Sequence, residues 1–310
     1  MIYWMYSLPV WLFAVLTLLA FCAFGIGGLA ATRKWAHSLH HATVSHNDIV
    51  GYYFGAITLL YGITLGLLMV GDWSTFTNTQ EKVDREASTL AAFYLDVSHY
   101  PDPIRGRLQK DLRNYTHEVI DVAWPEQQKG LIPRGNVLIV VNLATDLATF
   151  EPCSEEQKIL HSETYNRFNE LVERRRSRLL GVTAGLSGAL WALVLIGAAI
   201  NIAATWCFYL HNQRMHFWMT ALTSSLLGLM IFLLAAMDHP YLGKISVSLE
   251  PFQLIYDDLM KPDETTPDSG ILSAPTNLSK RLVIQKRSCG DRKFPQLEFP
   301  GAKTNLSFSS

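Results

Sequence analysis

The stretch "HNDIVGYYFGAITLLYGITLGLLMVGDW", His46 to Trp73, decides the fold of this chain. Its apolar part is longer than the roughly 18 residues that mark a helix able to cross a bilayer. It also carries glycines at positions 51, 55, 62 and 66. Glycine weakens a helix, so four of them in one membrane helix need a physical reason.

Three further stretches are as apolar as this one. They are Leu8–Ala31, Gly185–Leu210 and Met215–Met237. Together with Ile49–Gly71 from the opening stretch, they predict four membrane helices. The first stretch is too long for a signal peptide, and no Lys or Arg precedes it, so we expect it to be retained. The net charge of −1 over 310 residues indicates no particular partner.

The rest of the chain reads mainly as helices. A polar segment of residues 72–184 separates the two predicted helix pairs, residues 1–71 and 185–259, and its apolar residues recur at helical spacing. "SEEQ" at Ser154–Gln157 is a capping box that opens a helix running straight into the third span, and Pro125 should end an earlier helix. "NVLIVV" at residues 136–141 is the one strand-like exception. We expect an amphipathic helix after the fourth span, and a disordered tail over residues 260–310.

These segments predict an all-α membrane protein with four transmembrane helices. A helical bundle would be inserted between the second and third, with its outer helices continuing the membrane helices.

The four glycines of the second span share one side of the helix. At 100° per residue they fall within about 60° of one another, and the same face holds Gly51, Gly55, Thr58, Gly62, Gly66 and Met69. Small residues let helix backbones approach closely, which favours a packing face. The alternative is a face that lines a narrow ion pathway.

Polar residues at the span ends have simple roles. Asn47 or Asp48 can cap the first free amides of the second span. The basic run of Arg174, Arg175, Arg176 and Arg178 precedes the third span. It suits an anchor at the lipid headgroups, or an electropositive mouth that attracts anions.

Several kinds of chemistry lose support. No span has a charged residue or histidine in its interior, which disfavours proton-coupled pumps. The chain contains no GxSxG, HExxH, GxxxxGK[ST] or GxGxxG motif, so we expect no catalytic residue, no cofactor and no nucleic-acid partner. His37, His40, His41 and His46 are spaced as in some metal sites, but loop histidines are usually solvated, so we expect no metal.

The basic residues also predict orientation. Near the helix ends, three lie on the short-loop side, Arg33, Lys34 and Arg214. Seven lie on the side of the 72–184 segment, namely Lys82, Arg85, Arg174, Arg175, Arg176, Arg178 and Lys244. The positive-inside rule therefore places that segment and both termini in the cytoplasm, in a plasma (inner) membrane.

Three short motifs carry a resemblance to a family. They are His46-Asn47-Asp48 and Glu86-Ala87 in the second span and its extension, and Asp238-His239-Pro240 after the fourth span. With "LWALVLIGAAINIA", they resemble the bestrophin-like bacterial membrane proteins, over about Leu8 to Leu259. The resemblance implies four membrane helices with a helical insertion. Its more distant link to bestrophins implies a pentameric anion channel with the second helix at the pore.

The chain departs from the bestrophins after the fourth span. Asp257 and Asp258 are all that corresponds to the acidic run of their calcium clasp. Two functional hypotheses follow. One is a homo-oligomeric channel, in contact with membrane lipid, for monovalent anions such as chloride. The alternative is a non-conducting scaffold or sensor that binds a partner through its helical domain. We do not expect an enzyme.

Overall fold

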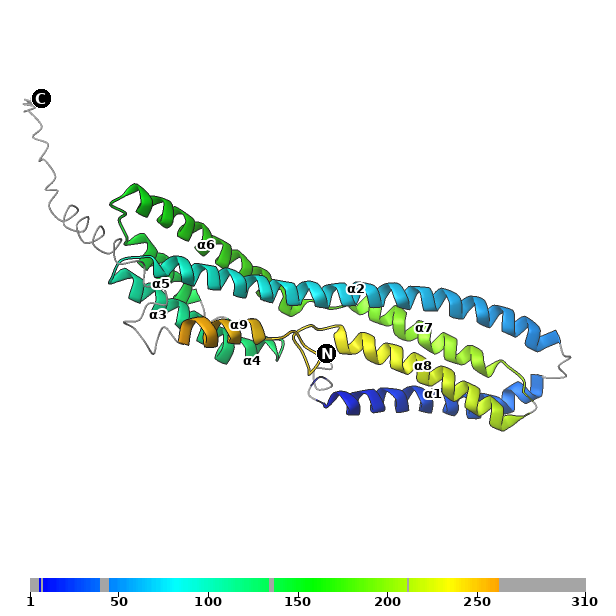
Figure 1. The fold of residues 1–310 in the computed structure, drawn as a ribbon. Coiled ribbons are helices and arrows are strands. Elements are labelled where there is room, and N and C mark those ends of the chain that lie inside the picture. The colour runs from blue at the N-terminus through cyan, green and yellow to red at the C-terminus, as the bar shows by residue number, and fades with distance from the viewer. Residues whose placement is uncertain (1–5, 7, 40–44, 134–136, 211, 262–310) are drawn as a thin grey trace, which may run out of the picture.

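The computed structural model describes residues 6, 8–39, 45–133, 137–210 and 212–261, with the backbone alone described at 33–39, 45 and 46. In the described residues, every regular element is a helix. The molecule is elongated and has two halves (Figure 1). We call the half with α1 (Val10–Leu39), α7 (Gly188–Trp206) and α8 (Gln213–Met237) the apolar half, and the other the polar half.

Helix α2 (Ser45–Ser98) runs through both halves as one helix of 54 residues. Its first part, up to Gly71, lies beside α7 and α8, and its second part packs along α6 (Glu155–Leu180). The second part is amphipathic, and its apolar side is buried at Val83, Ala87, Leu90, Tyr94 and Val97. The sequence prediction that the second span continues outside the apolar half as a long helix fits this arrangement.

Four described helical segments are long and apolar enough to cross a membrane: Val10–Thr32, Asn47–Ser98, Glu155–Trp206 and Gln213–Met237. Helix α1 lies along α8 and also contacts α7, and glycines allow both close approaches. A Cβ at Gly28 would collide with the Trp206 ring, and one at Gly228 would lie 3.2 Å from Phe21 Cβ. The Trp206 indole also donates a hydrogen bond of 3.0 Å to the Gly25 carbonyl.

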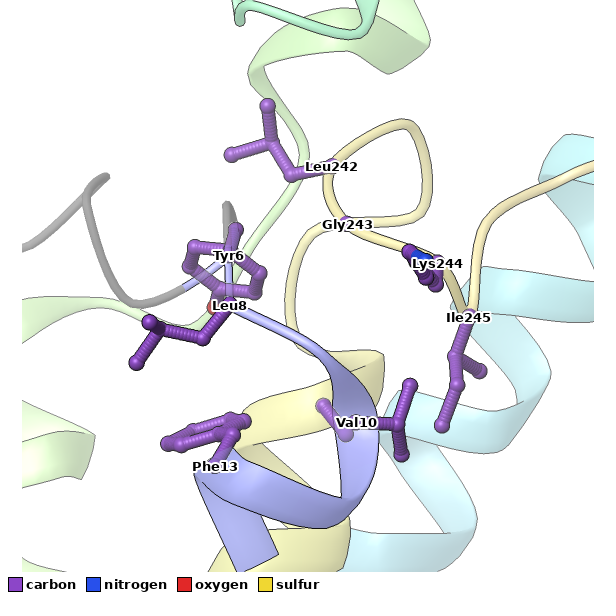
Figure 2. Close-up of a pocket in the computed structure, with 9 residues that line it drawn as sticks. Tyr6, Leu8, Val10, Phe13, Leu242, Gly243, Lys244 and Ile245 are labelled. Atoms are coloured by element: carbon purple, nitrogen blue, oxygen red, sulfur yellow. The ribbon is translucent and has the colours of Figure 1, made fainter. Parts of the chain in front are cut away.

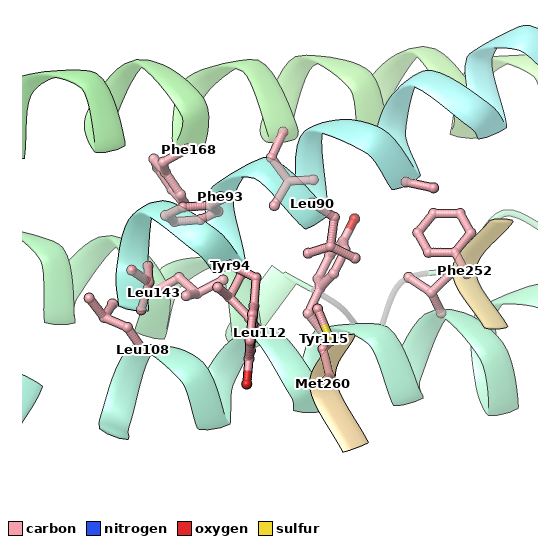
Figure 3. Packing of buried hydrophobic residues seen from close by; sticks show 14 of the residues in the cluster. Leu90, Phe93, Tyr94, Leu108, Leu112, Tyr115, Leu143, Phe168, Phe252 and Met260 are labelled. Carbon is pink, nitrogen blue, oxygen red and sulfur yellow. The ribbon is translucent and has the colours of Figure 1, made fainter. Parts of the chain in front are cut away.

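The polar half is built around one buried core (Figure 3). Helix α3 (Ile104–His117) continues through a π-helical turn, η2 (Glu118–Ala123), into α4 (Trp124–Gln127). Pro125 therefore does not end this helix, contrary to the sequence prediction. The π turn directly before it, with its Trp124 N–H bonded to the Val119 carbonyl, widens the helix where the proline ring must fit.

The strand-like run is also a helix over its described residues, 137–141. Helix α5 (Val137–Ala148) packs on α3, with Leu143 and Leu147 fully buried. Val140, Leu143, Ala144 and Leu147 recur at helical spacing, and this period outweighs the β-branched composition of the first residues. The interpretation of "NVLIVV" as a strand is wrong.

The capping box that opens α6 is present in a modified form. The Ser154 side chain accepts a hydrogen bond from the Gln157 N–H at 3.2 Å. The Gln157 side chain reaches back to the Cys153 N–H, 2.8 Å away, one residue earlier than in the standard box. At its other end, α6 does not run straight into α7, contrary to expectation. A short 3₁₀ turn, η3 (Gly181–Thr183), and an extended stretch to Ser187 separate the two helices.

After α8 the chain turns at Asp238 and crosses to the polar half. There α9 (Glu250–Ile255) and a π turn, η4 (Tyr256–Met260), close the core with Phe252 and Met260, both fully buried. This is the amphipathic helix expected after the fourth span. The tail predicted to be disordered lies outside the described residues, apart from its first two.

Candidate functional site: the glycine face of α2 and the junction below it

The glycines of α2 are open in the single chain. A Cβ built on Gly51, Gly55, Gly62 or Gly66 would meet no other described atom within 4 Å. These four positions, which we call the glycine face, therefore pack against none of the described residues of their own protomer. Close packing on the described helices of the protomer is thus not the reason for these glycines.

The other two residues predicted on this face lie at its edge and point partly inward. The Thr58 hydroxyl donates a hydrogen bond of 2.9 Å to Asn201 Oδ1 on α7. Met69 packs against the core of the apolar half. Asn201 is 1% exposed, and its Nδ2 donates to the Gly197 carbonyl at 3.0 Å. Thr58 thus satisfies a buried amide, which is the usual role of a polar residue between membrane helices.

The small residue that matters for packing α2 is on its neighbour. Gly197 of α7 lies against the ring of Tyr61, and an added Cβ would be 2.5 Å from the ring. The Tyr61 hydroxyl donates to the Val194 carbonyl at 2.9 Å, which fixes the ring in this position. Sequence reasoning missed this contact because it searched for small residues within α2 alone.

Asn47 and Asp48 do not cap α2. The helix already begins at Ser45, so both residues lie in its first turn. The Asn47 side chain instead holds the end of the third span. Its Nδ2 donates to the Tyr209 carbonyl at 2.6 Å, and its Oδ1 accepts from the Tyr209 N–H at 3.0 Å. Asp48 is exposed.

The four arginines before the third span have different surroundings. Arg176 is exposed, whereas Arg174 and Arg175 are half-buried and Arg174 donates to Glu170 at 3.1 Å. Arg178 is fully buried. The prediction of a uniform electropositive mouth is therefore wrong for Arg178, because its charge is neutralised inside the protein.

The partner of Arg178 is Glu86 on α2. Arg178 Nε donates to Glu86 Oε2 at 2.6 Å, and Nη2 donates to Oε1 at 3.1 Å. The Tyr115 hydroxyl donates to the same Oε1 at 2.6 Å, and burial raises the pKa of Tyr115 well above its ordinary value. We call Glu86, Arg178 and Tyr115 the buried triad, since all three are completely covered. The triad joins α2, α3 and α6 in the polar half, close to its border with the apolar half.

The sequence contained a signal for the triad. Glu86 lies next to Val83, Ala87 and Leu90 on the side of α2 that is otherwise apolar. A charge on an apolar face predicts a buried partner, because an unpaired buried charge is very costly. The sequence alone could not say which arginine supplies that partner.

A second set of buried polar groups lies at the break between α6 and α7. Asp238, which follows α8, accepts hydrogen bonds from the Leu186 N–H at 2.5 Å and from the Trp191 indole at 3.0 Å. His239 Nδ1 lies 2.9 Å from the Ala184 carbonyl. These contacts explain two of the three residues of the Asp238-His239-Pro240 motif: they hold the ends of α7 and α8 together.

The start of α1 closes this region from one side. The Tyr6 hydroxyl donates to the Ala235 carbonyl at 2.9 Å, and its ring lies edge-on against His239. Figure 2 shows the shallow apolar pocket beside it. The pocket is lined by Tyr6, Leu8, Val10, Phe13, Ala236, Leu242, Gly243, Lys244 and Ile245. Gly243 has φ +79° and faces Tyr6 closely, so a larger residue there would be strained.

In the described residues, no group of three or more His, Cys, Asp or Glu side chains could hold a metal ion. The side chains of His37, His40, His41 and His46 lie outside the described residues. Within the described part of the chain, the site therefore has two components. One is the open face on the apolar part of α2, and the other is a network of buried charges where the two halves meet.

Comparison with known proteins assigns the family. A model of the Bestrophin-like domain matches residues 19–252, which is more than half of the chain. The chain belongs to the bestrophin-like family. The resemblance seen in the sequence motifs is thus confirmed.

Solved structures support the same fold for this bestrophin-like protein. A point mutant of a bacterial bestrophin homologue from Klebsiella pneumoniae is 13% identical, with a TM-score of 0.60. The match covers 80% of this chain and 98% of that one. A second point mutant of a bestrophin homologue from that organism is 14% identical, with a TM-score of 0.55 over 83% and 99% of the two chains. At such identities the likeness shows the fold, and the expected all-α, bestrophin-like membrane fold is confirmed. The comparison with curated proteins finds no match.

Proposed function

We propose that this chain is one protomer of a homo-oligomeric, bestrophin-like channel for monovalent anions, with the glycine face of α2 toward the pore axis. The observation that carries the proposal is the openness of that face within the protomer. Glycines that pack on no described residue of their own chain leave room for neighbouring copies or for an ion pathway at their centre.

The oligomer is part of the proposal because four helices alone enclose no aqueous pathway. The core of the apolar half is filled by side chains such as Leu65, Val194 and Ile231. A pathway must then form between protomers, with a pentamer expected by analogy with bestrophins. Membrane lipid would cover the remaining apolar surface.

The distribution of charged residues favours conduction of anions over cations. Between Gly51 and Gly66 no residue of α2 is acidic, and Arg176 is exposed at the end of α6 nearest the apolar half. A positive mouth with neutral walls raises the local concentration of anions.

Flux from liposomes tests this proposal. Purified protein in liposomes should pass chloride in preference to sodium. Neutralising Arg174, Arg175 and Arg176 together should lower chloride flux more at about 0.01 M than at about 1 M salt, because the Debye length falls from roughly 30 Å to roughly 3 Å. Replacing exposed Lys110 of α3 by Gln is the matched control, and it should leave the chloride flux unchanged at both salt concentrations.

Two results would contradict the proposal. A current selective for cations would oppose the electrostatic argument, and mass photometry showing a monomer in mild detergent would oppose the oligomer.

A scaffold or sensor is the second candidate, and one observation favours it. Helix α5 and the loop before it expose apolar side chains on the polar half, at Leu131, Ile132, Val137, Leu138 and Val141. Exposed apolar patches of this kind mark interaction surfaces. A stable complex with another protein through this patch, together with no flux above empty liposomes, would favour the scaffold.

A further inference from the structure

One buried carboxyl group has no role in the contacts described so far. Asp72 directly follows the apolar stretch of α2 and is 4% exposed, and its Oδ2 has no hydrogen-bond partner among the described residues. A buried oxygen without a partner is rare, because the lost hydration is not replaced. We therefore expect Asp72 to bind a ligand through this oxygen.

A second buried carboxyl group, that of Asp238, interacts with Asp72. Asp238, at the end of α8, is 3% exposed, and its charge acts on Asp72. Asp238 itself has two N–H donors, from Leu186 and Trp191, and its Oδ2 lies 3.7 Å from His239 Nε2. The oxygens of Asp238 thus have hydrogen-bond donors, whereas Asp72 Oδ2 has none among the described residues.

The other elements around Asp72 do not balance a second negative charge. On α6, Arg178 is committed to Glu86, and Lys244, in the loop after α8, is exposed to solvent. The residues of α2 from Leu68 to Phe76 include no other charged side chain. His239 faces Asp238 and the Ala184 carbonyl. Burial and a like charge both oppose ionisation of Asp72.

We propose that Asp72 binds a proton in the folded protein, and that this proton allows α2 to pack against the end of α8. When the proton is lost, a buried charge without a partner is left on α2, and its contact with the end of α8 is weakened. The site is a proton-binding site, and its test does not require that the chain conducts ions.

The sign of the pH effect follows from linkage. In the unfolded chain an aspartate ionises near its ordinary pKa of about 3.9. Burial and the charge of Asp238 raise the pKa of Asp72 in the folded chain to about 7. Between these two pKa values the native chain binds one more proton than the unfolded chain, so stability falls as the pH rises through this range. We expect the melting temperature in detergent to fall by about 5 °C or more between about pH 5 and about pH 8.

Two substitutions should separate the two carboxyl groups. Asp72→Asn mimics the protonated form, so it should remove most of this pH dependence and raise the melting temperature at about pH 8. Asp238→Asn loses a charged acceptor for two donors and should lower the melting temperature at every pH. Asp84→Asn, on the exposed side of the same helix, is the matched control and should leave the pH dependence unchanged.

An infrared measurement on the unmodified protein gives an independent readout. Raising the pH should remove an absorption band of a protonated carboxyl group, and Asp72→Asn should lack that band. The proposal is overturned if the band is unaffected by the substitution. It is equally overturned if Asp72→Asn melts with the same pH dependence as the unmodified chain.

Discussion

Arg178 and Glu86 show how much a single buried charge depends on its partner. Both side chains are fully covered, and Tyr115 supplies a further donor to the carboxylate. Taking two charges from water costs several kcal/mol each, and the direct contact repays that cost only when the pair is intact. The pair therefore specifies how α2 and α6 meet more than it adds to overall stability.

We predict that breaking this pair is far worse than replacing it. Arg178→Met or Glu86→Met alone should destabilise the protein by about 3–5 kcal/mol, because each leaves an uncompensated buried group. The double variant Glu86→Met with Arg178→Met should lose much less than the sum of the two single losses. Denaturant unfolding in detergent measures these free energies.

The exposed pair of Arg85 and Glu81 is the control for this cycle. Their side chains are 56% and 54% exposed, so Glu81→Gln should change stability by less than about 1 kcal/mol. Additive losses in the Glu86–Arg178 cycle would show that the two residues do not act as a pair.

At the scale of the element, glycine has two different uses in the apolar half. Gly197 lies against Tyr61 and permits a contact inside the protomer, whereas Gly62 faces open space. A larger residue should therefore destabilise the protomer at Gly197 and the oligomer at Gly62.

We predict that Gly197→Ala destabilises the protomer by about 1–3 kcal/mol, since the new Cβ would overlap the Tyr61 ring. Gly62→Leu should leave the melting temperature of the separated protomer unchanged but dissociate the oligomer, because leucine keeps neighbouring copies apart. Gly55→Leu should act like Gly62→Leu, and Leu60→Ala should be milder. Thermal unfolding measures the stability of the protomer, and mass photometry measures the oligomeric state. An oligomer that survives both leucine substitutions would show that the glycine face is not an interface.

At the scale of the whole molecule, orientation in the membrane follows from the distribution of basic residues. We predict that the polar half and both termini are cytoplasmic. A cysteine at exposed Asn114 of α3 should then resist an impermeant thiol reagent applied to intact cells, and should react after the cells are lysed. Efficient labelling of intact cells would reverse the orientation.

Much of the fold could be predicted because it follows from local patterns. Long apolar runs, the "SEEQ" start of α6 and the helical period after Trp73 each depend on residues that are close in sequence. The sequence prediction missed the π turn before Pro125, because a proline inside a helical pattern ordinarily ends the helix. It also missed the break between α6 and α7, since that break depends on contacts with a distant segment. Asp238, for example, holds the Leu186 N–H from 52 residues away.

The candidate site was less accessible to sequence reasoning. The positions of the glycine face follow from helix geometry, but which of its residues point inward depends on where α7 lies. Thr58 illustrates this, because its partner Asn201 is 143 residues away. The arginines looked alike in sequence, and only the fold separates Arg178, which is paired with Glu86, from exposed Arg176.

The continuity of α2 gives the molecule a mechanical property. At about 1.5 Å per residue its 54 residues form a rod of roughly 80 Å, without a joint between the two halves. The α6–α7 connection, by contrast, is interrupted by a 3₁₀ turn and an extended stretch at residues 181–187. A tilt of about 5° at the level of Gly71 would displace the far end of the rod, 27 residues on, by roughly 3–4 Å. A force applied to the far end of the polar half would therefore be transmitted along α2 to the glycine face, whereas no continuous helix transmits it from α6 to α7.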